Sequence, residues 1–173
     1  MAKPILTAMA VAASLSCLTA NAQEAVAPAP VDTRLVTSVT LNDMRSIVTS
    51  YEHTVLQDLN GGTGLVVQTP TGYKYLVALR QCNEAQACEG VLLGASHDLP
   101  GGTTWEFVNQ LDREMEAFGM YVMNDQLIID RYMILSGGVQ VESFKHEIGR
   151  LIVVAPAIVG GMEKALAEAA ADG

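Results

Sequence analysis

The chain has 173 residues, of which 50% are hydrophobic and 17% are charged, and its formal net charge at pH 7 is −9. This length favours one domain, and the hydrophobic fraction is sufficient for a core. An excess of 19 acidic over 10 basic side chains repels nucleic acids and anionic lipids, and no basic cluster offsets it. Nucleic-acid-binding and polybasic membrane-binding proteins are therefore excluded classes.

The first 22 residues have the pattern of a secretory signal peptide. Lys3 supplies a positive start, residues 5–18 are nearly all apolar, and Ala20-Asn21-Ala22 is a small-x-small cleavage site. This apolar run is short against the roughly 20 residues that span a bilayer. Lipoprotein processing at Cys17 is disfavoured, because Ser14 stands where an apolar residue is needed. We expect cleavage at about Ala22 and a periplasmic or secreted mature chain without a transmembrane span.

Cleavage leaves two cysteines, Cys82 and Cys88, with five residues between them. In an oxidising compartment such a pair most simply forms a disulfide bond. A redox role prefers the C-x-x-C spacing at a helix start, which this pair lacks. A reactive or metal-binding pair remains the alternative.

Residues 23–38 contain prolines and alanines without apolar periodicity, which is typical of a flexible linker. The expected folded domain covers residues 39–169. It opens with an approximate capping box, Thr40 and Asp43, and a short amphipathic helix follows. The apolar residues of this helix recur at helical spacing: Leu41, Met44, Ile47, Val48 and Tyr51.

Strands are expected next. Residues 52–59 alternate poorly, and only Val55 and Leu56 suggest a strand there. Clearer strands are residues 65–68 and 73–80, which are joined by a Pro- and Gly-containing turn, and residues 91–95 follow after a polar loop. One face of the second clear strand holds Tyr73, Tyr75, Val77 and Leu79. Its other face holds Lys74, Leu76, Ala78 and Arg80 and is only partly polar.

A second helix is expected from a cap at Thr103 or Thr104 to Phe118. Its predicted buried stripe is Trp105, Val108, Leu111, Met115 and Phe118. A β-hairpin turned at Asn124-Asp125 follows, and Gly137-Gly138 separates it from a last, long helix.

The last helix is apolar on every side. A stripe runs at steps of three or four residues from Ile148 to Leu166, and the opposite side is also non-polar. Such a helix must be covered on more than one side. Pro156 should kink it. We expect part of it to form a surface for a partner or a second copy, through Leu151, Val154, Pro156, Ile158, Val159 and Met162.

The chain resembles the YbjN family, bacterial domains labelled sensory transduction regulators, over roughly residues 39–166. The resemblance is carried by short motifs in a characteristic order: Thr40-Leu41-Asn42-Asp43-Met44, Gly72-Tyr73-Lys74-Tyr75-Leu76-Val77, the pair Cys82 and Cys88, the helix at 105–118 with Asn109, and Gly138-Val139. The chain departs from the family in its last helix, where residues 151–158 are aliphatic and interrupted by proline.

This resemblance implies an α+β fold similar to type III secretion chaperones. The expected order is α-β-β-β-α-β-β-α, with three helices and an antiparallel sheet of about five strands. The family has no established catalytic residues, so none is transferred to this chain.

The sequence offers no constellation for catalysis, a cofactor or a metal. His53, His97 and His146 stand in separate elements without companion ligands at metal-binding spacing. Asp130 and Arg131 interrupt an apolar strand, where they either pair across it or face solvent. We therefore expect a non-enzymatic, chaperone-like or regulatory module that binds a protein or peptide. The alternative is a structural or stress-related envelope protein that acts as a homodimer.

Overall fold

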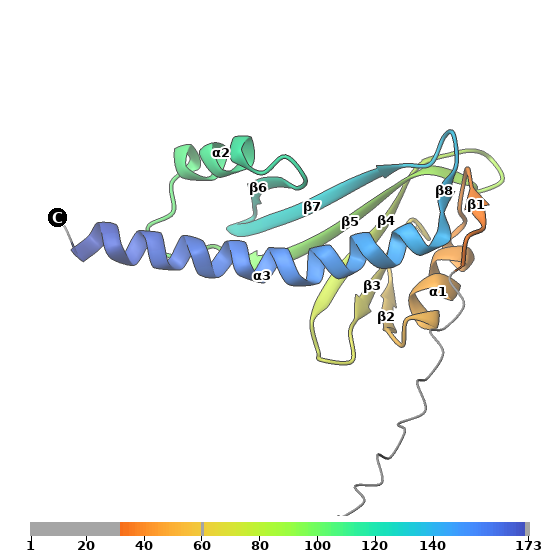
Figure 1. Cartoon of the computed structure of the whole chain (residues 1–173), viewed down its shortest axis with the longest axis horizontal. Helices are drawn as coiled ribbons and strands as arrows, with labels where there is room; N and C mark the ends of the chain where they lie inside the picture. Colours follow the sequence, from red (N-terminus) through yellow and green to blue (C-terminus); the bar gives the residue numbers. More distant parts are fainter. Residues whose placement is uncertain (1–31, 60, 172–173) are drawn as a thin grey trace, which may run out of the picture. The chain divides into compact units, whose positions relative to one another are not determined.

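The computed structural model describes residues 32–59 and 61–171 (Figure 1). The predicted signal peptide lies outside these residues, as does most of the predicted linker. The elements are, in chain order, β1 (Leu35–Val36), α1 (Leu41–Ser50), β2 (Thr54–Asp58), β3 (Gly64–Gln68), β4 (Lys74–Cys82), β5 (Cys88–Asp98), α2 (Trp105–Glu114), β6 (Gly119–Met123), β7 (Gln126–Ile134), β8 (Val139–Gln140) and α3 (Val141–Ala171).

The fold is α+β, as predicted, with a fully antiparallel main sheet of six strands in the order β2-β3-β4-β5-β7-β6. Four strands precede α2, one more than the expected order counted. The weakly indicated strand at residues 52–59 is β2, an edge strand with one partner and a register shift between Val55 and Gln57. Because most of its residues are exposed, its sequence lacks the alternation of a half-buried strand.

A second sheet pairs β1 with β8 in antiparallel register, Leu35 opposite Gln140 and Val36 opposite Val139. Leu35 and Val36 fall within the predicted flexible linker, residues 23–38. Two residues are too few to produce an alternation signal, and their partners lie about a hundred positions away in the chain.

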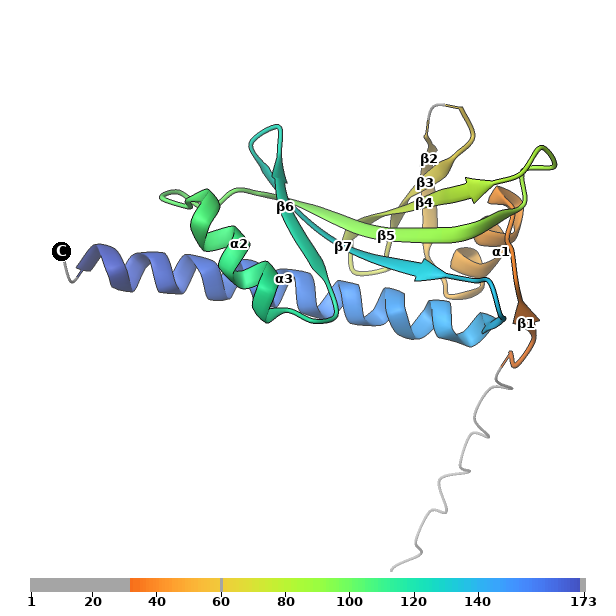
Figure 2. The same ribbon diagram turned by 90° about the horizontal axis from the view of Figure 1, so that it is seen from above.

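Helices α1 and α3 cover one face of the main sheet, which we call the inner face (Figure 2). The odd-numbered residues of β4, β5 and β7 are buried there against α3, and they include Val77, Leu93 and Ile129. The even-numbered residues of the same strands point to the opposite face, which we call the outer face. The predicted face of β4 is confirmed for Tyr75, Val77 and Leu79, all of which are buried.

The predicted capping box at the start of α1 is confirmed. The Asp43 amide donates to Thr40 Oγ1 at 3.2 Å, and the Thr40 amide donates to Asp43 Oδ2 at 2.8 Å. These two bonds satisfy donors that a helix start otherwise leaves open. They fix α1 so that Met44, Ile47 and Val48 are buried against the sheet.

Helix α2 is shorter than predicted, and its stripe is partly wrong. Thr104 caps it by accepting a bond from the Phe107 amide at 3.2 Å, but the helix ends at Glu114 and not at Phe118. Phe118 is buried in the core from the connection to β6, whereas Trp105 is 62% exposed. Phe107, two residues further along, packs against the core instead, because the start of α2 turns Trp105 towards solvent.

The two breaks around β7 are confirmed. Asn124 and Asp125 both have positive φ, 52° and 60°, as the tight turn between β6 and β7 requires. Gly137 and Gly138 have φ of 99° and 95° and turn the chain from β7 into β8 and α3.

Helix α3 is continuous over 31 residues and passes through Pro156 without interruption. Proline leaves the carbonyl four residues earlier without its helical donor. Pro156 is exposed, so this carbonyl lies on the solvent side of α3 and water can satisfy it. Within the described residues, no helix is both long and apolar enough to cross a membrane.

Candidate functional site

The outer face of the main sheet is unusually apolar for a solvent-facing surface. Of the large hydrophobic side chains that are exposed, four lie on the outer-face positions of β6 and β7: Tyr121, Met123, Tyr132 and Ile134. Val66, Leu76, Leu92 and Ile128 extend the same surface across β3, β4, β5 and β7. In the part of the chain that the structure describes, helices pack on the inner face, and this surface stays open to solvent.

Six of these side chains line an open concavity of about 580 Å³, which we call the outer-face concavity: Val66, Leu76, Leu92, Tyr121, Met123 and Ile128. Its size is within the range of small-ligand sites, about 300–1,000 Å³. The floor is low because Gly94 has no side chain, and Gly94 pairs with Leu76 on one side and with Asp130 on the other. The concavity therefore combines apolar side chains with a few polar ones, among which Asp130 is the one carboxylate.

Asp130 stands between two glycines, Gly94 on β5 and Gly119 on β6. A methyl group at Gly119 would lie 2.9 Å from Asp130 Oδ1, so glycine leaves the room that the carboxylate occupies. The pKa of Asp130 is raised, mainly by burial. A hydrogen bond from the Tyr121 hydroxyl lowers this pKa in part, and the negative charge of Asp112 raises it. Burial likewise raises the pKa of Tyr121.

Two cations flank the concavity on β4. Lys74 lies at the exposed start of the strand, and the Arg80 guanidinium donates to the Leu79 carbonyl at 3.0 Å. Both were predicted on the partly polar face of this strand, together with Leu76 and Ala78, and the structure confirms this arrangement. The concavity itself was not predicted, because it is completed by strands that are far apart in the sequence.

Asp130 and Arg131 point to opposite faces of β7. Arg131 reaches under α3, where its Nε lies 3.0 Å from Glu147 Oε2 and its Nη1 donates to the Ala117 carbonyl at 2.7 Å. The prediction that the two residues pair across the strand or face solvent is therefore wrong for Arg131, whose partner is on a helix. Of the two residues, only Asp130 lines the outer-face concavity.

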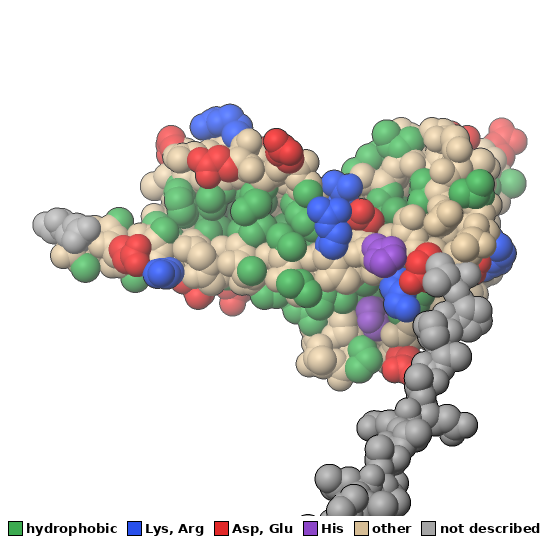
Figure 3. Space-filling model, in the orientation of Figure 1, with side chains coloured by type: hydrophobic (Ala, Val, Ile, Leu, Met, Phe, Trp, Pro, Cys, Tyr) green, Lys and Arg blue, Asp and Glu red, His purple; other side chains and the backbone are tan. Residues whose placement is uncertain are grey.

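A second apolar surface lies between α2 and α3, where Figure 3 shows hydrophobic side chains gathered. This α2–α3 groove has a volume of about 460 Å³ and an almost wholly apolar lining, which includes Phe107, Leu111, Met115, Val153, Val154 and Ile158. Val153 is 70% exposed beside it.

The residues predicted as a partner or dimer surface differ in burial, and three of them, Val154, Ile158 and Met162, line this groove. Leu151, Ile158 and Met162 are buried in the core against the sheet, so they present little surface to a partner. Val154 and Val159 are partly buried, and Pro156 is exposed. The spacing in the sequence could not separate these groups, because both sides of α3 are apolar.

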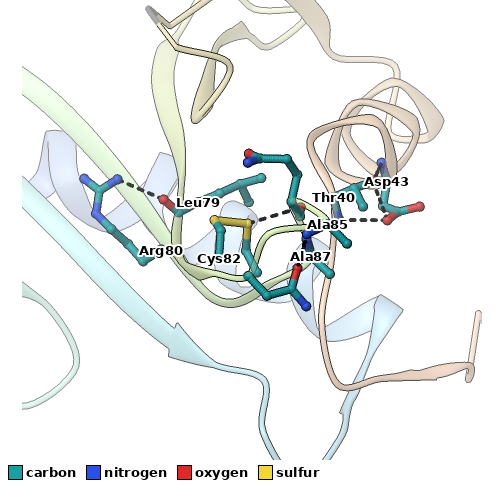
Figure 4. The surroundings of a disulfide bond; sticks show 10 residues. Thr40, Asp43, Leu79, Arg80, Cys82, Ala85 and Ala87 are labelled. Carbon is teal, nitrogen blue, oxygen red and sulfur yellow. Dashed lines mark hydrogen bonds between the residues drawn. A yellow bond between two sulfur atoms is a disulfide. The ribbon is translucent and has the colours of Figure 1, made fainter.

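Cys82 and Cys88 are joined by a disulfide bond that closes the β4–β5 hairpin (Figure 4). They are directly opposite in register, with Cα atoms 3.8 Å apart. The backbone of Cys88 exchanges two hydrogen bonds with Val39, at 2.9 and 3.0 Å, and thereby ties the hairpin to the segment before α1. The bond therefore lies at the hairpin end, away from the outer-face concavity.

His53 and His97 each bond to a tyrosine, and His146 is exposed on α3. His53 Nδ1 lies 2.8 Å from the Tyr75 hydroxyl, and His97 Nε2 lies 3.0 Å from the Tyr73 hydroxyl. Burial lowers the pKa of both rings. Residues 32–59 and 61–171 contain no group of three or more His, Cys, Asp or Glu side chains placed to hold a metal ion.

The chain matches no model of a known protein family and no curated protein. The outer-face concavity and the α2–α3 groove are therefore interpreted from their own chemistry.

Proposed function

We propose that the chain is an exported, non-enzymatic member of the YbjN family that works in the periplasm as a chaperone-like or regulatory binding module. Its partner is a protein that presents an apolar helical segment to the outer face. The observation that carries this proposal is the concentration of exposed apolar side chains around one concavity of about 580 Å³ on an otherwise acidic protein. Contiguous exposed apolar patches mark interaction sites.

The dimensions of the surface favour a protein segment. Its lining comes from five neighbouring strands, β3, β4, β5, β7 and β6, which at about 4.8 Å per spacing extend roughly 19 Å across the sheet. A helix with its side chains is about 10 Å wide and fits in this width. Helix α3 covers the inner face of the same sheet in this way.

Filling the floor of the concavity should weaken binding. In Gly94→Leu the first added carbon lies 3.7 Å from Asp130 Cβ and 3.9 Å from the Ile129 carbonyl, ordinary contacts that leave the backbone in place. The rest of the side chain then occupies the site. We expect affinity for a fluorescent amphipathic helical peptide, measured by anisotropy, to fall at least about tenfold, which is about 1.4 kcal/mol.

Gly149→Leu is the matched control. It adds the same side chain on α3, where a Cβ meets nothing within 4 Å, and it should leave binding unchanged. Unaltered affinity in Gly94→Leu, with the fold intact by circular dichroism, would show that the outer face is not the binding surface.

A homodimer is the second candidate, and the α2–α3 groove favours it. Val153 is an exposed apolar side chain beside an apolar groove, so two copies related by a two-fold axis can each insert this side chain into the other's groove. Sedimentation at several protein concentrations tests this candidate. A dimer that Val153→Glu dissociates supports it, and a monomer at all concentrations refutes it.

A further inference from the structure

We propose that Asp130 makes the outer face selective for helical segments that carry a basic side chain within their apolar surface. This inference rests on the proposed function, because it assigns the partner chemistry of the same site. A cationic nitrogen that reaches the floor of the concavity would form a charge-assisted hydrogen bond with Asp130, while its apolar stem lies against the walls.

Asp130 is half-buried and bonded by the Tyr121 hydroxyl, and it stays partly open towards the outer face. Its two neighbours across the sheet, Gly94 and Gly119, have no side chains that could cover it. Leu76, Val66, Leu92 and Ile128 form apolar walls around this opening. A carboxylate surrounded by such walls interacts strongly with one cation, because little water competes for it.

The stability of the fold does not require this carboxylate. A carboxyl group whose pKa is higher in the folded than in the unfolded chain binds its proton more tightly when folded. Folding stability therefore falls as the pH rises through that interval, and the ionised Asp130 is unfavourable for folding at neutral pH. Asp130→Asn should fold at least as stably as the unaltered chain, which makes it a suitable test variant.

The other charges around the concavity are compatible with a cationic group at Asp130. Lys74 and Arg80 are on β4, two strands from β7, and the charge of Arg80 reaches Tyr121 on β6, where it lowers the pKa, so these two cations offset part of the attraction of Asp130 for a cation. Asp112 on α2 adds a negative charge that favours the cation, and Tyr121 on β6 is neutral at pH 7. The lining residues of β3 and β5 are not ionisable.

The test uses two helical peptides of about 15 residues that differ at one position of the apolar face. One carries lysine there, and the other carries Nε-acetyllysine, which keeps the stem and removes the charge. We expect the full chain to bind the lysine peptide roughly tenfold more tightly, in line with the energy of a hydrogen bond to a charged group. Asp130→Asn should lose this preference and still bind the acetyllysine peptide.

Asp125→Asn is the matched control, because it removes the same charge from the turn of the same hairpin, outside the concavity. It should keep the preference for lysine. The preference should also weaken as the pH is lowered through the pKa of Asp130, since the protonated carboxyl carries no charge.

The outcomes separate this inference from the proposed function. Equal binding of both peptides by the unaltered chain, or a preference that survives in Asp130→Asn, overturns the role of Asp130 and leaves the outer face as a binding surface. Absence of binding to both peptides overturns the two proposals together.

Discussion

Replacing Phe144 by alanine should lower the free energy of unfolding by about 3–5 kcal/mol. Phe144 is the largest fully buried side chain and lies on α3, where its ring packs in the core between this helix and the sheet. Truncation removes buried apolar contacts and leaves a cavity that a close-packed core refills poorly. Urea unfolding followed by circular dichroism measures the loss.

Val153→Ala on the same helix is the control. Because Val153 is 70% exposed, this change should alter the free energy of unfolding by less than about 0.5 kcal/mol. A loss below about 1 kcal/mol for Phe144→Ala would mean that α3 is not a wall of the core. The assignment of the outer face as the free face of the sheet would then fail as well.

Removing the carboxylate of Glu147 should destabilise the fold by about 2–3 kcal/mol. Glu147 contacts two cations, Arg131 at 3.0 Å and Arg150 at 3.4 Å, and its side chain is 16% exposed. Glu147→Leu leaves the half-buried Arg131 guanidinium with only the Ala117 carbonyl as a partner. The expected loss is below that of a fully buried pair, because the Arg131 side chain is 31% exposed.

The double variant Arg131→Met with Glu147→Leu should recover most of this loss, since removing both charges of a buried pair costs little. Glu168→Leu breaks an exposed pair with Lys164 and should change the free energy of unfolding by less than about 0.5 kcal/mol. If the loss of unfolding free energy in the double variant equals the sum of the losses in Arg131→Met and in Glu147→Leu, the pair does not act as a unit. Thermal and urea unfolding of the unaltered chain, the two single variants and the double variant measure this coupling.

Local patterns in the sequence predicted much of the fold. The capping box at Thr40 and Asp43, the turn at Asn124-Asp125 and the break at Gly137-Gly138 each depend on a few neighbouring residues, and all three are confirmed. The errors concern places where distant partners decide. Leu35 and Val36 form a strand only because β8 returns beside them, and Phe118 enters the core only because α2 ends early.

The candidate site was harder to predict than the fold. Leu76 and Ala78 already indicated that the second face of β4 is not fully polar. The neighbours of Asp130, however, follow from the pairing of β7 with β5 and β6, and β5 and β6 are separated by α2. Without that register, Gly94 and Gly119 are ordinary strand glycines and Asp130 is an isolated charge.

The apolar last helix shows the same limit. The periodicity identified Leu151, Ile158 and Met162 as one stripe, and the structure buries that stripe in the core of the chain itself. The pattern could not distinguish a helix covered by its own sheet from one covered by a partner, because both require the same side chains.

The most direct test of the outer face is to map the methyl groups whose nuclear magnetic resonance signals shift when the lysine-containing helical peptide is added. We expect shifts at Val66, Leu76, Leu92 and Ile128, with Val153 and Val154 in the α2–α3 groove unaffected. Shifts confined to Val153, Val154 and their neighbours would contradict it and would place the binding surface on α3.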